Sequence, residues 1–151
     1  MRGYSGIDTA LSACLHFVRN SEIDDTTTDI FASVREKNIT VVYVDFLGQS
    51  VRDSGILQSI AQQLDLGSQP YMRDDYLPFW DDLISLAYKK FGLVIVLDNA
   101  ADFLATAPAE FFDLIEAFMV QFNHWFKLNK PCHLCFQMEK NILIADLLAD
   151  H

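Results

Sequence analysis

The sequence of 151 residues has little positive charge. Lys and Arg number 11 against 21 Asp and Glu, which gives a formal net charge of −10. Non-specific affinity for DNA and RNA comes from Lys and Arg side chains that displace counterions from phosphates, so this balance argues against a nucleic-acid-binding protein. It favours a basic protein as the partner, because complementary charge speeds association.

Cysteine and long apolar runs are also scarce. Three cysteines, Cys14, Cys132 and Cys135, are too few for a secreted disulfide framework, so we expect free thiols. A membrane span needs about 18 consecutive apolar residues, and polar residues interrupt the apolar stretch at 4–18, which also lacks the features of a signal peptide. We therefore expect a cytoplasmic protein that contacts no membrane.

Three short apolar runs are typical of β-strands: residues 39–46, 93–98 and 132–138. The first two are continuous and rich in β-branched residues, which is the pattern of parallel strands covered on both faces. The segments between the runs are long enough for right-handed helical crossovers. The sequence thus predicts an α/β fold with a small three-stranded parallel sheet packed by helices.

Apolar residues at spacings of three and four predict the crossover helices. The first helix is expected to begin at Asp53 as its N-cap and to stop at Gly67. A second is expected from about residue 75 or 77 to Lys89 and Lys90. The third, the clearest, opens at Pro108. Its expected inward face comprises Phe111, Leu114, Ile115, Phe118, Phe122, Trp125 and Phe126.

The first 38 residues are expected to form an N-terminal helical lead-in. Apolar residues predict two short helices there, at residues 9–18 and 29–37. The length of the chain fits one domain of ordinary size. We therefore expect residues 1–38 to pack on the core of a single globular domain whose main part is residues 39–151.

The usual residues of enzyme and metal sites are missing. There is no Gly-rich phosphate loop, so Asp98 at the end of the second run is better interpreted as a cap of the following turn than as a metal ligand. Four scattered histidines have no partner nucleophile in a G-x-S-x-G turn, so surface or helix-end roles are expected for them. Cys132 and Cys135 form a C-x-x-C, but within a strand their sulfurs point to opposite faces, which indicates buried apolar residues. We expect no enzymatic activity, no metal and no cofactor.

The acidic residues are concentrated in residues 65–116. This segment holds ten acidic residues and three basic ones, a net charge of −7 out of −10. Its densest part interleaves carboxylates with aromatic rings: Tyr71, Asp74, Asp75, Tyr76, Phe79, Trp80, Asp81 and Asp82. One interpretation is a solvated, well-capped helix start, because acids there are favoured by the helix dipole. The other is a contact surface for a partner, because aromatic anchors beside charges are typical of binding hot spots.

The order of these elements resembles the barstar-like family of intracellular ribonuclease inhibitors and immunity proteins. The resemblance covers residues 39–138 and rests on the runs ITVVYVDFLG at 39–48, DYLPFWDDL at 75–83 and LVIVLD at 93–98. It implies a small parallel sheet packed with helices. It also implies that the loop and helix at 71–83 occlude a ribonuclease active site, with a carboxylate in the place of the RNA phosphate.

The resemblance assigns roles to single residues by position. Asp81 corresponds to the family's central inhibitory aspartate, Tyr71 to the aromatic residue of the preceding loop, and Trp80 to the residue beside the aspartate. Leu77 stands where a second binding aspartate is usual. Val120 and His124 stand where acidic residues are common. The expected partner-binding set is Tyr71, Asp74, Asp75, Tyr76, Trp80, Asp81 and Asp82.

Two functions are consistent with these patterns. The first is an immunity or antitoxin protein that binds a basic toxin, with a ribonuclease as the foremost candidate, and occludes its active site. The alternative is an interaction or regulatory module that keeps the scaffold and no longer inhibits a ribonuclease. Leu77, in place of an aspartate, favours the alternative.

Overall fold

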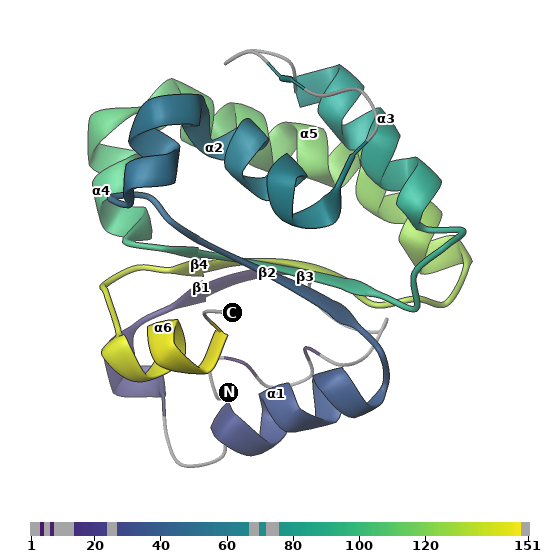
Figure 1. The fold of residues 1–151 in the computed structure, drawn as a ribbon, viewed down its shortest axis with the longest axis horizontal. Coiled ribbons are helices and arrows are strands. Elements are labelled where there is room, and N and C mark those ends of the chain that lie inside the picture. The colour runs from purple at the N-terminus through teal and green to yellow at the C-terminus, as the bar shows by residue number, and fades with distance from the viewer. Residues whose placement is uncertain are drawn as a thin grey trace.

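The computed structural model describes residues 4, 7, 14–23, 27–66, 70–71 and 76–148. Within these residues the chain forms one parallel sheet of four strands in the order β1-β4-β3-β2 (Figure 1). The strands are β1 (Leu15–Val18), β2 (Thr40–Asp45), β3 (Leu93–Asp98) and β4 (Cys132–Gln137). The parallel α/β class predicted from the sequence is confirmed.

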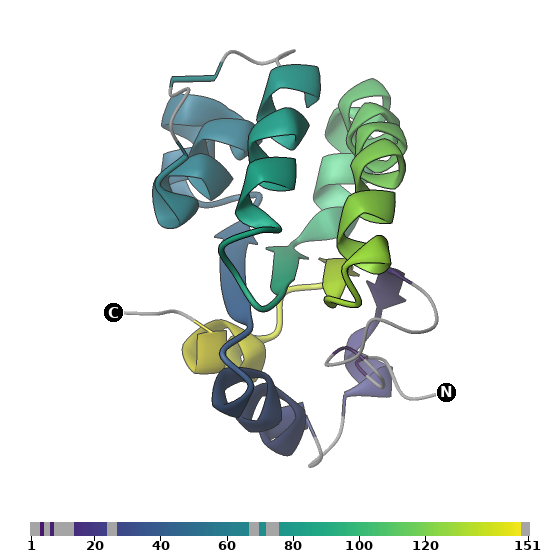
Figure 2. The ribbon, with the colours of Figure 1, turned by 90° about the vertical axis from the view of Figure 1, so that its right-hand side faces the viewer.

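Helices cover both faces of the sheet. They are α1 (Thr27–Glu36), α2 (Gln49–Leu64), α3 (Tyr76–Leu86), α4 (Ala100–Thr106), α5 (Pro108–Lys127) and α6 (Ile142–Leu148), with a 3-10 helix η1 (Asn20–Glu22). Helices α2 to α5 lie on one face, and α1 and α6 lie on the other (Figures 1 and 2). Both crossovers, from β2 to β3 and from β3 to β4, run over the first face.

The central strand β3 is buried along its whole length. Leu93, Ile95 and Leu97 belong to the core beneath α2, α3 and α5, whereas Val94 and Val96 belong to a second core beneath α1 and α6. Alternate residues of a strand point to opposite faces, so a strand that is apolar at every position needs cover on both sides. The continuous run 93–98 therefore predicts this two-faced core.

The expectation of three strands was wrong, because residues 15–18 form a fourth strand instead of the end of a helix. β1 pairs in parallel with β4, with Leu15 opposite Leu134 and Phe17 opposite Phe136. Its four residues are too few for a period of two to be distinguished from a helical period. The expected N-terminal helical lead-in thus also contributes a strand to the sheet, whereas its second helix is present as α1.

Helix α2 differs from its prediction at both ends. It begins at Gln49 after Gly48, not at Asp53, and Gly55 interrupts it with a φ of 86°. The buried residues lie only in the second half, from Ile56 onward, which is why the periodicity gave no sign of the first half. The helix ends at Leu64, where Asp65 takes a left-handed φ of 52°. The predicted stop at Gly67 lies outside the described residues.

The remaining helices agree only in part with their predictions. α3 ends at Leu86, before Lys89 and Lys90. α5 begins at Pro108 as predicted, but Phe126 is 47% exposed and does not join its inward face. Helices α4 and α6 were not predicted, since seven residues make too few turns for an apolar stripe to be recognised.

Gly92 provides a test of the close packing where β3 begins. A Cβ atom there would lie 2.8 Å from Cγ and 2.9 Å from the carbonyl oxygen of Pro131. We expect Gly92→Ala to lower the free energy of unfolding by about 1–3 kcal/mol, the usual cost of overpacking. Urea unfolding measures it, with the exposed-site variant Ser85→Ala expected to change by less than about 0.5 kcal/mol. Equal stability of the two variants would contradict the prediction.

Candidate functional site

Asp81 lies on the exposed side of α3. The helix buries Phe79, Trp80 and Leu83 against the sheet, and because they share one side of the helix, Asp81 faces solvent. Within the described part of the chain, no hydrogen bond or ion pair joins Asp81 to another residue. Its carboxylate is therefore exposed to solvent, and its predicted contact with a partner stays a prediction.

Tyr71 and Asp82 are joined to each other beneath that surface. The Tyr71 hydroxyl donates a hydrogen bond to Oδ2 of Asp82, and the Tyr71 backbone N–H donates to Oε1 of Gln58 at 2.8 Å. The Tyr71 ring is 5% exposed and meets Phe79 edge-on, with the ring centroids 5.4 Å apart. These contacts fix Tyr71 against α2 and α3, so Tyr71 and Asp82 support the surface from within.

Trp80 is a core residue, which corrects its assignment to the contact surface. Its side chain is 2% exposed and packs against Phe79 and Phe118, at centroid distances of 4.9 and 5.5 Å. Its Nε1 is the one buried side-chain nitrogen or oxygen atom without a hydrogen-bond partner among the described residues. Aromatic residues serve both as interface anchors and as core residues, so residue type alone did not separate the two roles.

The rest of the predicted set divides between the surface and the interior. Tyr76 is half-buried, and its hydroxyl donates to the backbone oxygen of Glu110 at 3.2 Å. Asp74 and Asp75 lie outside the described residues. Leu77, by contrast, is 65% exposed at the start of α3. On α3 the described surface thus presents the carboxylate of Asp81 together with the apolar side chain of Leu77.

The neighbouring helix α5 lies beside α3 (Figure 2). Val120 on α5 is 66% exposed, and His124 is exposed as well. Neither residue is acidic, so the described surface of the two helices carries less negative charge than the family resemblance implies.

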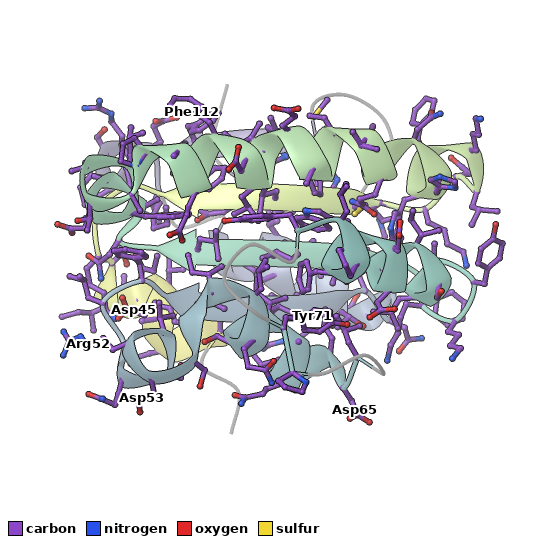
Figure 3. The ribbon with its side chains drawn as sticks, turned by 90° about the horizontal axis from the view of Figure 1, so that it is seen from above. Asp45, Arg52, Asp53, Asp65, Tyr71 and Phe112 are labelled. Atoms are coloured by element: carbon purple, nitrogen blue, oxygen red, sulfur yellow. The ribbon has the colours of Figure 1, made fainter. Side chains whose placement is uncertain are left out.

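A cavity of about 550 Å³ opens at the carboxyl end of β2. Its apolar wall includes Phe46, Val51, Ile56, Tyr71 and Tyr76. Figure 3 shows Tyr71 between α2 and α3, so its ring belongs both to the cavity and to the support of the α3 surface. The sequence reasoning missed this cavity. A glycine within an otherwise helical pattern was the available signal, because the break in α2 at Gly55 lies in the cavity wall.

A polar row crosses the opposite face of the sheet. Asp45, Asp98 and Gln137 are partners in the register of β2, β3 and β4. The buried Asp98 accepts hydrogen bonds from the Tyr43 hydroxyl and, at 2.9 Å, from the backbone N–H of Asn99. Asp98 therefore caps the turn after its strand, as the sequence predicts.

Asp45 is the half-buried end of this network. It accepts hydrogen bonds from Nζ of Lys140 at 2.6 Å, from Nδ2 of Asn99 at 2.7 Å and from the Leu47 backbone N–H at 3.0 Å. Burial opposes its charge, but these bonds, led by that of Lys140, hold the pKa of Asp45 below its usual value. Burial raises the pKa of Asp98, although the Tyr43 hydrogen bond opposes the rise. The acceptors of this row are satisfied internally, which indicates a structural role.

The cysteines and two histidines are also internal. Cys132 and Cys135 are fully buried in the cores of opposite faces, and burial raises the pKa of both thiols, which confirms their interpretation as apolar residues. His16 and His133 lie side by side, buried, with Nε2 of one 2.8 Å from Nδ1 of the other. Surface or helix-end roles were wrong for these two, because the pairing of β1 with β4 was not foreseen. Among the described residues, no group of three or more His, Cys, Asp or Glu side chains could hold a metal ion.

Comparisons with protein-family models, with curated proteins and with solved structures found no match. Among the described helices, none is long and apolar enough to cross a membrane. The functional assignment therefore depends on the geometry of this chain and on the resemblance in its sequence.

The Asp98 network predicts a particular dependence on pH. A raised pKa in the folded state means that Asp98 contributes most stability below its ordinary pKa and loses it as the pH rises through the raised value. Asp98→Asn removes the charge and keeps a polar partner for Tyr43 and Asn99. We expect it to be at least as stable as the parent at neutral pH and to lack this decline.

The matched variant Asp98→Ala leaves both donors unpaired. We expect it to lose about 1–3 kcal/mol of unfolding free energy, the cost of buried unsatisfied groups. Urea unfolding between about pH 4 and pH 8 compares the three proteins across the range in which a raised aspartate pKa is titrated. If Asn and Ala were equally destabilising at neutral pH, burial of the charge would not be the governing effect.

Proposed function

We propose that this chain is a non-enzymatic inhibitor, an immunity or antitoxin protein of the cytoplasm, that binds a basic toxin and occludes its active site. A ribonuclease is the foremost target. The observation that carries the proposal is the exposed carboxylate of Asp81, which lies at the position of the inhibitory aspartate in the family resemblance and uses no partner in the described part of this chain.

The charge of the acidic segment supports a basic partner. Residues 65–116 carry a net charge of −7 in sequence. Asp98 is buried and faces the opposite side of the sheet, and Asp82 is engaged by Tyr71. Asp81 is thus the acidic group of α3 that is best placed to enter a basic pocket, and the other exposed carboxylates of the segment add a longer-range attraction.

The support beneath Asp81 favours tight binding. Phe79, Trp80 and Leu83 anchor α3 in the core, while a hydrogen bond ties Tyr71 to Asp82 of the same helix. A rigid helix loses little conformational entropy on binding. The carboxylate can therefore take the position of a substrate phosphate without a costly rearrangement of the inhibitor.

The arrangement of the crossovers is consistent with this proposal. The chain runs from β2 through α2 and α3 to β3, and then through α4 and α5 to β4. The family resemblance implies a small parallel sheet packed with helices, and residues 39–138 take that general form. The fourth strand, β1, extends this sheet at its edge, beside β4.

Asp81→Ala tests the proposed contact. We expect it to weaken binding to a basic ribonuclease toxin that the parent chain binds by at least about 30-fold, or roughly 2 kcal/mol, because a central charged contact is lost. Calorimetric titration measures the affinity. Asp102→Ala is the matched control, since Asp102 is an exposed aspartate on α4, at the other end of the helical layer (Figure 1). An affinity of the Asp81 variant within about threefold of the parent, below roughly 0.7 kcal/mol, would refute the proposal.

Leu77 and Val120 favour a second candidate, an interaction module that has lost ribonuclease inhibition. Both are apolar and about two-thirds exposed, at 65% and 66%, where acidic residues are usual in the family resemblance. A partner bound mainly through these side chains would make little use of Asp81.

Ionic strength separates the two candidates. For an electrostatic inhibitor we expect the association rate constant with the toxin to fall at least about tenfold between low and physiological salt, because salt screens the steering charges. Stopped-flow mixing of the two proteins measures the rate. The same rate at both salt concentrations would favour the apolar module instead.

A further inference from the structure

The loops that precede β3 and β4 lie side by side. They comprise residues 87–92 and, with the last residue of α5, residues 127–131. Nζ of Lys130 donates a hydrogen bond to the backbone oxygen of Ala87 at 2.5 Å, which joins the two loops. Both lie at the same extremity of the long axis of the molecule (Figures 1 and 2). We call this region the amino-end surface, because the parallel strands begin there.

The amino-end surface is basic, although the whole chain is acidic. It contains four of the 11 basic residues: Lys89, Lys90, Lys127 and Lys130. The segments to which they belong, residues 83–97 and 117–138, contain no Asp or Glu. Residues 35–37, which lead from α1 towards β2 at the same end of the sheet, add two basic side chains and one acidic. Salt screens exposed charges beyond about 8 Å, so the lysines dominate the local potential.

Helix capping does not account for all of these lysines. A helix dipole favours cations in the last turn of the helix, but Lys89 and Lys90 lie beyond the end of α3 at Leu86. Within the described part of the chain, no hydrogen bond or ion pair engages the side chain of Lys89, Lys90 or Lys127. These three ammonium groups therefore give the surface a positive charge that no described carboxylate neutralises.

Two aromatic side chains lie among the lysines and do not join the core. Tyr88 is 69% exposed and Phe91 is 64% exposed, and Leu128 on the adjoining loop is 38% exposed. Large apolar side chains lose the free energy of burial when they remain in water. Exposed apolar residues that occur singly are common, whereas a group on two joined loops is typical of an interaction site.

The backbone that carries these rings is held in place. The backbone N–H groups of Lys89 and Lys90 both donate to the oxygen of Leu86 at 2.9 Å. At Gly92, a Cβ atom would lie 2.8 Å from Cγ of Pro131, so the two loops are closely packed. A surface that is already ordered loses little conformational entropy when it binds.

We propose that the amino-end surface docks reversibly on a membrane that contains anionic lipid. Clustered lysines are attracted to negative headgroups, and aromatic rings favour the boundary between headgroups and acyl chains. A planar bilayer can reach loops at an extremity of the molecule, whereas peptides bind mainly along grooves and sheet edges. Single-stranded nucleic acids likewise follow charged grooves.

This contact is compatible with the other features of the chain. The expectation that the chain contacts no membrane was based on the lack of an apolar span, and a peripheral contact needs none. The proposal does not use Asp81, so it is independent of the toxin-binding function.

Vesicle flotation of the full chain tests the docking. With vesicles of phosphatidylcholine and about 30% phosphatidylserine, we expect half-maximal binding below about 1 mM lipid, and binding at least about tenfold weaker to phosphatidylcholine alone. Equal binding to the two kinds of vesicle, or no flotation at about 2 mM lipid, would overturn the proposal. Binding of a single-stranded RNA 20-mer without vesicle binding would assign the surface to nucleic acid instead.

Two variants locate the contact. Lys89→Glu should weaken binding to the anionic vesicles at least about tenfold, and Phe91→Ala at least about threefold. Arg52→Glu, with the same change of charge at the opposite extremity (Figure 3), and Leu143→Ala, at a 75% exposed site on α6, are the matched controls. Both controls should stay within about twofold of the parent. Parental binding by both Lys89→Glu and Phe91→Ala would refute docking through this surface.

Discussion

The burial of β3 on both faces is the constraint on which the rest of the structure depends. Every residue of this strand is inaccessible to solvent, so each face of the sheet needs an apolar layer. Helices α2, α3 and α5 provide one layer, and α1 and α6 provide the other. The strand also ends in a buried carboxylate at Asp98, and the hydrogen bonds from Tyr43 and Asn99 compensate for its loss of water.

The sequence predicts those elements in which the pattern of apolar residues is long enough to be recognised. The continuous apolar runs of β2 and β3 and the long stripe of α5 are examples, because each is lengthy and buried on a defined side. β1, with four residues, is too short for this. The break in α2 depends on one backbone angle at Gly55, which leaves no periodic trace among the neighbouring residues.

The candidate site was predictable to a similar degree. Asp81 could be placed on the exposed side of α3, because three buried residues of the helix fix its orientation. The burial of Trp80 and the hydrogen bond between Tyr71 and Asp82 depend on how α3 and Tyr71 pack against α5 and α2, which no local pattern records. The pairing of His16 with His133 likewise follows from the register of two strands that are distant in sequence.

The burial of Trp80 has an optical consequence for the candidate surface. The chain contains two tryptophans, and both Trp80 and Trp125 are shielded from solvent. The Trp80 indole also has no hydrogen-bond partner at Nε1, so it resides in an apolar environment that favours blue-shifted emission. A ligand that docks on Asp81 without moving α3 leaves that environment intact. The intrinsic fluorescence of this protein therefore reports displacement of the helix core, and occupancy of the outer surface alone is spectroscopically silent.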